Sequence, residues 1–259
     1  MSLTERIKNM FRPAYHLLKR SYKQVFRLFT GNSFNASNYK EIPVIINNYN
    51  RLTYPKLLIA KLESWGYRNI FILDNNSTFP PLLEYYKNTS CKVIRLKENM
   101  GYMALWKSGC YTKFKSGYYV YTDPDVLPLD SCGEDFLLVM LDQLKKYPAI
   151  EKIGLALSVH DLPDHYALKE KVIAWEKPHW EKKITEMIYD APVDTTFALY
   201  RPLAKGNAEQ CPAYRINGRY GAKHLPWYED SANLSEEELY YQGSITKKDS
   251  YWINQHKSK

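Results

Sequence analysis

From residue 42 onward, short apolar runs alternate with segments of helical periodicity. Apolar and β-branched residues predict strands over residues 42–46, 69–73, 92–95 and 118–122. Between them, helix-start signals and apolar spacing predict helices over residues 53–64, 81–88 and 101–116. Strands that alternate with helices indicate an α/β domain with a mostly parallel central sheet flanked by helices.

Polar residues cluster directly after three of these strands, at residues 47–51, 74–77 and 123–125. The carboxyl ends of parallel strands share one edge of a sheet, so we expect these clusters to converge there. The chain has no G-x-G-x-x-G or G-K-[ST] loop to cradle phosphates. If the ligand carries phosphates, a metal would have to neutralise them.

The third cluster is the sequence Asp123-Pro124-Asp125. Pro124 fixes its own φ and favours an extended Asp123, so both acids lie on a stiff segment at the end of a strand. Carboxylates in this position suit a hard divalent cation that also binds a diphosphate. The alternative is an ordinary turn, in which Asp and Pro are common for conformational reasons. The pair alone does not separate these two interpretations.

The first 30 residues form a different pattern. Their apolar residues form a stripe at helical spacing, and seven basic residues all lie outside this stripe. The stripe comprises Leu3, Ile7, Met10, Phe11, Ala14, Leu18, Tyr22, Val25 and Phe29. With one acid among them, these residues carry +6 of the net charge of +8. The pattern is typical of a helix on an anionic membrane surface, and also of a helix packed on the domain with a solvated basic face. A polar linker follows at residues 31–38.

Composition narrows the class of protein. A chain of 259 residues, 45% hydrophobic and 25% charged, predicts a globular domain with one appendage. Its four cysteines form no C-x-x-C pair, which argues against a zinc module or a disulfide framework and favours a reducing cytosol. No apolar run is long enough to span a membrane, and the near-neutral body argues against nucleic acid. We therefore expect a cytoplasmic protein, peripheral on the cytoplasmic face of the membrane if the first helix binds lipid.

Four motifs, in order and spacing, resemble those of glycosyltransferases of the GT-A fold, close to the family 2 type. They are V-I-I-N-N-Y-N-R at 44–51, I-L-D-N-N-S at 72–77, E-N-M-G at 98–101 and T-D-P-D-V at 122–126. The resemblance covers residues 42–126 and is looser beyond residue 130. It implies a Rossmann-like GT-A domain over residues 39–259, with a nucleotide-sugar half at 39–130 and an acceptor half at 131–259. Residues 1–38 are then the amphipathic segment and linker.

The resemblance also implies roles for residues. The expected nucleotide-sugar contacts are Asn47, Asn48, Asn50, Arg51, Asp74, Asn75, Asn99, Gly101 and Asp123. Asp125 would coordinate Mn²⁺ or Mg²⁺, and Asp123 would meet the sugar or ribose directly or through the metal. His224 would be the remaining metal ligand, the alternative being an ordinary core or surface histidine. The first loop departs from the family, which often has Thr or Pro-Thr/Ser-Tyr-Asn where this chain has Asn-Asn-Tyr-Asn.

The acceptor side is less defined. An inverting transfer needs a carboxylate to take the acceptor proton, and our candidate is Asp194, with Asp161 and Asp164 as rivals. Asp194 as a turn or cap residue, and a retaining mechanism without a base, stay open. We expect a UDP-sugar donor, through the resemblance alone, and a glycan or lipid-linked glycan acceptor. The rival classes are a metal-dependent nucleotidyltransferase and a membrane-surface protein without catalysis.

Overall fold

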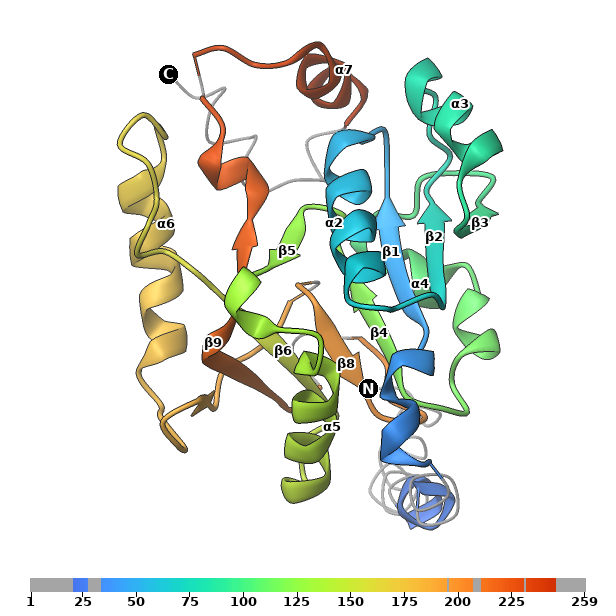
Figure 1. The fold of residues 1–259 in the computed structure, drawn as a ribbon, viewed down its shortest axis with the longest axis vertical. Coiled ribbons are helices and arrows are strands. Elements are labelled where there is room, and N and C mark those ends of the chain that lie inside the picture. Colours follow the sequence, from blue (N-terminus) through green and yellow to red (C-terminus); the bar gives the residue numbers. More distant parts are fainter. Residues whose placement is uncertain (1–20, 28–33, 195, 207–210, 231, 246–259) are drawn as a thin grey trace, which may run out of the picture.

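The structure is a computed structural model that describes residues 21–27, 34–194, 196–206, 211–230 and 232–245 (Figure 1). In this part of the chain, helices flank a central nine-stranded sheet of order β3-β2-β1-β4-β8-β6-β9-β5, with β7 also paired to β9. The strands are β1 (Val44–Asn48), β2 (Ile70–Asp74), β3 (Lys92–Arg95), β4 (Tyr119–Thr122), β5 (Val126–Pro128), β6 (Lys152–Leu157), β7 (Ile188–Tyr189), β8 (Ala198–Tyr200) and β9 (Ala213–His224). The helices are α2 (Thr53–Ser64), α3 (Pro80–Asn88), α4 (Ala104–Lys107), α5 (Phe136–Lys146), α6 (Lys169–Glu176) and α7 (Glu236–Ser244). The predicted α/β class is confirmed.

Strand directions place several strand ends at one edge of the sheet. β3, β2, β1 and β4 pair in parallel, as the alternating pattern predicts. β8 is antiparallel to both β4 and β6, so β4 and β6 run in the same direction, and β9 is parallel to β6. The carboxyl ends of β1, β2, β4, β6 and β9 therefore all lie at the same edge.

Both faces of the central strands are buried, which explains their continuous apolar runs. On β1, Val44 and Ile46 face a cluster that includes Leu58 of α2 and Phe136 of α5, and both helices lie over this face in Figure 1. Ile45 points the other way, into a second cluster with Leu105 of α4. Alternate residues of one strand thus hold the two helical layers onto the sheet.

Two predicted elements differ from the observed ones. The first strand ends at Asn48 rather than residue 46, so the first two asparagines of the polar cluster belong to the strand. The predicted helix over 101–116 is broken into two 3₁₀ turns around the four-residue α4. Gly109 interrupts it with φ of 78°, a left-handed conformation that an α-helix does not accept.

Only residues 21–27 of the predicted amphipathic segment are described, and they are helical. Lys23 and Arg27 pair with Glu151 of the domain at 3.0 and 2.7 Å. Tyr22 and Val25, members of the predicted apolar stripe, are 60% and 52% exposed. In this segment Lys23 and Arg27 face the domain, while Tyr22 and Val25 of the apolar stripe face outward. A helix packed on the domain with a solvated basic face would show the opposite. In the described part of the chain, no helix has the length and apolar character to cross a bilayer.

Candidate functional site

The predicted polar clusters meet at the shared sheet edge. Asn48 on β1 lies beside Asp74 on β2 in the parallel register. Asn75 Nδ2 donates to Asn47 Oδ1 at 2.6 Å, and Asn75 Oδ1 accepts from the backbone N–H of Met100 at 3.1 Å. The first loop, the second loop and the E-N-M-G segment are therefore tied together, although they are distant in sequence.

In that segment, Asn99 is exposed and its Oδ1 accepts from the N–H of Gly101 at 2.8 Å. Gly101 has φ of 69°, a left-handed conformation that suits glycine. Its carbonyl accepts a long hydrogen bond, 3.5 Å, from Asn47 Nδ2. The backbone here is shaped locally, while the Asn99 side chain stands at the surface.

Most of the predicted nucleotide contacts use their polar atoms within the protein. Asn50 Oδ1 accepts from the N–H groups of Thr78 and Phe79 at 2.6 and 3.0 Å, at the start of α3. Asn48 Nδ2 donates to the Arg51 carbonyl at 2.8 Å. Asn48 and Asn50 are fully buried. These bonds shape the loop, and direct contact with a nucleotide stays a prediction for both residues.

Asp74 is buried in the same way. Its carboxylate accepts from Tyr86 at 3.1 Å, from Arg95 Nε at 3.2 Å and from the Ser77 N–H at 3.1 Å. Burial chiefly raises the pKa of Tyr86, and the Asp74 charge raises it further. The Tyr86 hydroxyl therefore stays protonated as a donor. The carboxylate fixes the second loop, and a base or ribose contact would have to share it with these partners.

Asp125 and His224 face each other across the junction of β5 and β9. Val126 lies opposite His224 in the antiparallel register, and the Leu225 N–H donates to the Asp125 carbonyl at 2.8 Å. His224 Nε2 stands 3.8 Å from Asp125 Oδ1, a distance too long for a hydrogen bond. Asp125 Oδ1 and His224 Nδ1 are buried and have no hydrogen-bond partner among the described residues. The structure thus brings together two residues that are 99 positions apart in the sequence and leaves their polar atoms unsatisfied.

Burial lowers the pKa of His224, and nearby Arg51 lowers it further, against the opposing effect of Asp125. The imidazole is therefore neutral at pH 7, with one nitrogen that carries a lone pair. A buried carboxylate oxygen without a donor is unfavourable. Two ligands that share a cation at ~2.1 Å stand about 3 to 4 Å apart, depending on their angle. A divalent cation could therefore contact both Asp125 Oδ1 and His224 Nε2 at close to their observed separation of 3.8 Å.

The described residues alone do not form a complete metal centre. Among the residues that the structure describes, no group of three or more His, Cys, Asp or Glu side chains is placed to hold a metal. Asp125 and His224 would supply two ligands, and a diphosphate and water would have to supply the others. This division is typical of Mg²⁺ in nucleotide sites, which binds one or two carboxylates together with substrate phosphates. Asp123 lies two residues before Asp125, directly after β4, and is half-buried.

Arg51, predicted to meet the nucleotide, is instead paired within the protein. Its guanidinium is buried and lies 2.5 Å from Glu238 of α7. It also lies over the rings of Tyr241 and Tyr54, at 3.8 and 4.8 Å from their centroids. Burial disfavours the charged guanidinium, but Glu238 more than offsets this and raises the pKa of Arg51. A nucleotide contact from Arg51 stays a prediction, and it would have to compete with α7.

Helix α7 is the part of this site that the sequence analysis missed. It lies at the carboxyl edge of β1 and β2 (Figure 1). Glu237 accepts from the N–H groups of Leu52 and Thr53 at 2.8 and 3.0 Å, where α2 begins. Ser235 Oγ accepts from the Glu238 N–H at 3.1 Å, so a Ser-x-x-Glu capping pattern was available as the signal of a helix start. The sequence of the helix does not indicate which surface of the domain it covers.

Asp194 ends a segment that is fixed by its backbone. Buried Lys152 donates to the carbonyls of Val193 and Asp194, and Arg215 Nε donates to the Pro192 carbonyl at 2.8 Å. The side chain of Asp194 itself is exposed. Because β8 runs antiparallel to β4, the residues that precede β8 lie at the edge where β4 ends. Asp194 itself lies further back over the sheet, because its carbonyl is 3.3 Å from Nζ of Lys152 at the start of β6.

The two rival acids are engaged elsewhere. Asp161 lies 2.6 Å from Lys223, and hydrogen bonds from Lys223, Tyr228 and Ser158 outweigh the effect of its burial and lower its pKa to about 2. Asp164 pairs with Lys169 at 2.6 Å, and this hydrogen bond lowers its pKa. A carboxylate with a lowered pKa is a poor proton acceptor, so both are weak candidates for a base.

No family model matches the chain, and no curated protein matches it in sequence. Among solved structures, it is similar to S. aureus TarS 1-349, with a TM-score of 0.46 and 12% identity over 71% of this chain and 60% of that one. S. aureus TarS gives 0.46 and 12% over 81% and 45% of the two chains. GalNAc-T7 with UDP, GalNAc and Mn²⁺ gives 0.43 and 12% over 70% and 43%. The chain thus spans less than two thirds of each of these structures.

The resemblance to GT-A glycosyltransferases therefore rests on the sequence motifs and stays a prediction. At 12% identity and TM-scores below 0.5, the likeness carries no argument about reaction, donor or site residues. Those have to be argued from the sheet edge itself.

Proposed function

We propose that this chain is a divalent-cation-dependent glycosyltransferase that uses a nucleotide-sugar donor, with UDP as the expected nucleotide. The observation that carries the proposal is the half-buried pair of Asp125 and His224. Asp125 Oδ1 lies 3.8 Å from His224 Nε2 and has no hydrogen-bond partner among the described residues. The pair lies at the carboxyl edge of an α/β sheet, where such folds bind ligands. No glycine loop for phosphates is present in the sequence, which favours a cation as the means of neutralising a diphosphate.

Asp125 and His224 would hold Mn²⁺ or Mg²⁺, and the bound cation would stabilise the negative charge that develops on the departing nucleoside diphosphate. Asp123 would orient the ribose or the sugar from the end of β4. Asn99 and Gly101 would approach the donor from the E-N-M-G segment, where the Asn99 side chain is exposed. The expected product of donor cleavage is a free nucleoside diphosphate.

Asp194 would act as the base of an inverting transfer. As the acceptor oxygen bonds to the anomeric carbon, its proton passes to the Asp194 carboxylate. The bond from that carbon to the phosphate oxygen breaks, and the electron pair leaves with the nucleoside diphosphate. The fixed backbone of residues 191–194 supports this role, because a base has to be held within hydrogen-bond reach of its substrate.

We further propose a glycan or lipid-linked glycan acceptor, in surface polysaccharide or glycoconjugate synthesis, and a place on the cytoplasmic face of a membrane. Tyr22 and Val25 support this proposal, since they present apolar area outward from residues 21–27. The four cysteines are all free, which suits a reducing compartment.

A thermal-shift screen of nucleotide-sugars and nucleoside diphosphates, with and without Mn²⁺, tests the proposal. A ligand that binds the native state raises Tm according to its affinity and concentration. We expect UDP or a UDP-sugar to raise Tm only when Mn²⁺ is present. The Asp125→Ala variant should lose this shift, while Asp142→Ala, which removes an exposed carboxylate of α5, should keep it. No cation-dependent shift with any nucleotide would contradict the proposed function.

A further inference from the structure

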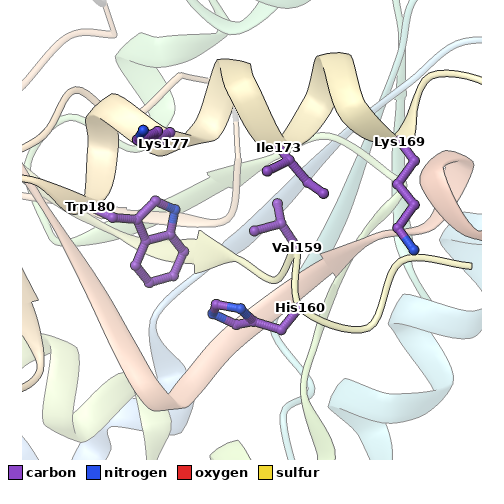
Figure 2. Close-up of a pocket in the computed structure, with 6 residues that line it drawn as sticks. All are labelled: Val159, His160, Lys169, Ile173, Lys177 and Trp180. Carbon is purple, nitrogen blue, oxygen red and sulfur yellow. The ribbon is translucent and has the colours of Figure 1, made fainter.

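A hollow lies in the later half of the chain, between α6 and the loop that follows β6 (Figure 2). Its volume of about 430 Å³ falls in the range of pockets for small ligands. The lining residues are Val159, His160, Lys169, Ile173, Lys177 and Trp180. None of the roles proposed above uses any of them.

The hollow opens beside the proposed donor site. Its first wall, Val159 and His160, follows β6, whose carboxyl end shares the sheet edge with the end of β4. In the parallel register of β6 and β9, Leu157 lies beside Ala222, two residues before His224. The Ser158 N–H donates to the Ala222 carbonyl at 2.8 Å. The hollow and the Asp125–His224 pair are therefore attached to the same stretch of β9.

Both walls of the hollow are anchored to β9. The loop wall is held by Asp161, whose carboxylate pairs with Lys223 at 2.6 Å and accepts from Tyr228 at 2.6 Å. The helix wall is held by a buried ion pair, 2.6 Å between Glu176 at the end of α6 and Arg215. With both sides fixed to one strand, the hollow is pre-formed and does not depend on a ligand to shape it.

The lining combines an aromatic ring, two apolar side chains and two ammonium groups. In the view of Figure 2, Trp180 and Lys169 stand at opposite ends, with Val159 and Ile173 between them. A flat indole suits the apolar face of a sugar ring. Lysine ammonium groups bind phosphates and carboxylates as point charges. None of the lining residues is a carboxylate.

Lys169 already has a partner, Asp164, at 2.6 Å. The side chain of Asp164 is 99% exposed, and exposed ion pairs contribute little free energy. A ligand anion can therefore replace Asp164 at modest cost. Lys177 is exposed, lies three residues before Trp180 in the sequence and lines the same hollow.

We infer that this hollow binds a sugar unit that carries a phosphate or a carboxylate, with the ring against Trp180 and the negative group at Lys169 or Lys177. As the description of an acceptor subsite, the inference rests on the proposed glycosyltransferase function. As a binding site for an anionic sugar it stands on the hollow alone, and it is tested without donor or cation.

The test is a titration of the full chain, followed by ¹H–¹⁵N NMR of the tryptophan indole groups, in metal-free buffer of constant ionic strength. The probes are glucose 6-phosphate, glucuronic acid, neutral glucose and inorganic phosphate. Trp180→Phe identifies the Trp180 indole signal. Lys169→Gln and Lys177→Gln remove one cation each. Lys145→Gln, which changes an exposed lysine of α5, is the matched control.

We expect at least one of the two charged sugars to bind roughly fivefold or more tightly than glucose and to shift the Trp180 signal. Each lining Lys→Gln change should weaken it roughly two- to fivefold, the range expected for an exposed charge pair. Lys145→Gln should have no effect. The probe that binds, phosphate or carboxylate, then identifies the negative group of the acceptor.

Two results would overturn the inference. If glucose binds as tightly as both charged sugars, the lysines do not select the ligand. If inorganic phosphate binds as tightly as glucose 6-phosphate without moving the Trp180 signal, the hollow is an anion site and no sugar subsite. Failure of the nucleotide screen alongside anionic-sugar binding would instead contradict the proposed function and leave this site in place.

Discussion

Glu238→Gln tests how helix α7 is held over the sheet edge. The change removes one charge of the buried pair with Arg51 and keeps the shape of the side chain. Both side chains of the pair are 6% exposed, so the remaining guanidinium would be buried without its counter-ion. Loss of one partner of such a pair typically costs about 3 to 5 kcal/mol. The rings of Tyr241 and Tyr54 and the charge of Asp125 still favour the cation, so we expect the lower end, about 3 kcal/mol.

This cost should appear as local opening of α7 and leave the sheet intact. The helix has nine residues, and besides the Glu237 contacts it keeps three hydrogen bonds to the first two loops. These join Asn50 to Ser244 at 2.9 Å, Tyr49 to the Ser244 carbonyl at 3.2 Å and Thr78 to Tyr240 at 3.0 Å. About 3 kcal/mol corresponds to roughly a hundredfold change in an opening equilibrium. Hydrogen exchange followed by mass spectrometry should therefore show roughly a hundredfold loss of protection in α7 and unchanged protection in β1.

Glu236→Gln is the matched control, because Glu236 is exposed in the same first turn of α7. It should leave protection nearly unchanged. Equal protection of α7 in the two variants would refute the reasoning, since it would mean that the Arg51–Glu238 pair does not hold the helix.

Three further predictions concern the Asp194 segment and the half-buried His179. Gly154→Ala should destabilise the protein by roughly 1 to 3 kcal/mol in urea unfolding, because the added Cβ would lie 2.4 Å from Val193 Cγ1; an unchanged midpoint would contradict the tight packing. Asp194→Asn should keep cation-dependent nucleotide binding and lose transfer roughly a hundredfold or more, and full transfer would remove Asp194 as the base. Burial and the charge of Arg215 lower the pKa of His179 from 6.5 to about 4, so the unfolded chain binds a proton first and stability falls as pH drops from 6.5 towards 4. His179→Gln should flatten Tm over this window, and equal slopes would contradict the assignment.

The first half of the fold was predictable because its signals are local. Strand runs such as 118–122 and the helix at 53–64 lie within a few residues of where the structure has β4 and α2. The predicted helix over 101–116 failed because a helical run of apolar residues does not show that Gly109 adopts a left-handed φ. Strands β5, β6, β7 and β9 were not predicted, and each of them pairs with a segment far along the chain.

The site was predictable as a set of polar loops but not as a set of free side chains. Asn50 and Asp74 have the residue types of a ligand pocket, yet their polar atoms bind the loops themselves. A sequence does not show whether an amide faces a ligand or its own backbone. Arg51 is a similar case, because its partner Glu238 lies 187 positions later. Asp125 and His224 were both predicted as metal ligands, and among the described residues each has a buried polar atom without a hydrogen-bond partner.

The central claim is that Asp125 and His224 hold a divalent cation together with a nucleoside diphosphate. Pulsed electron paramagnetic resonance of Mn²⁺, bound to the full chain in the presence of UDP, reads the nitrogen ligand directly. The account predicts modulation from one imidazole ¹⁴N and from ³¹P, with the nitrogen signal lost in His224→Ala and kept in His179→Ala. A UDP-dependent Mn²⁺ spectrum with no nitrogen coupling, or a coupling that survives His224→Ala, would contradict it.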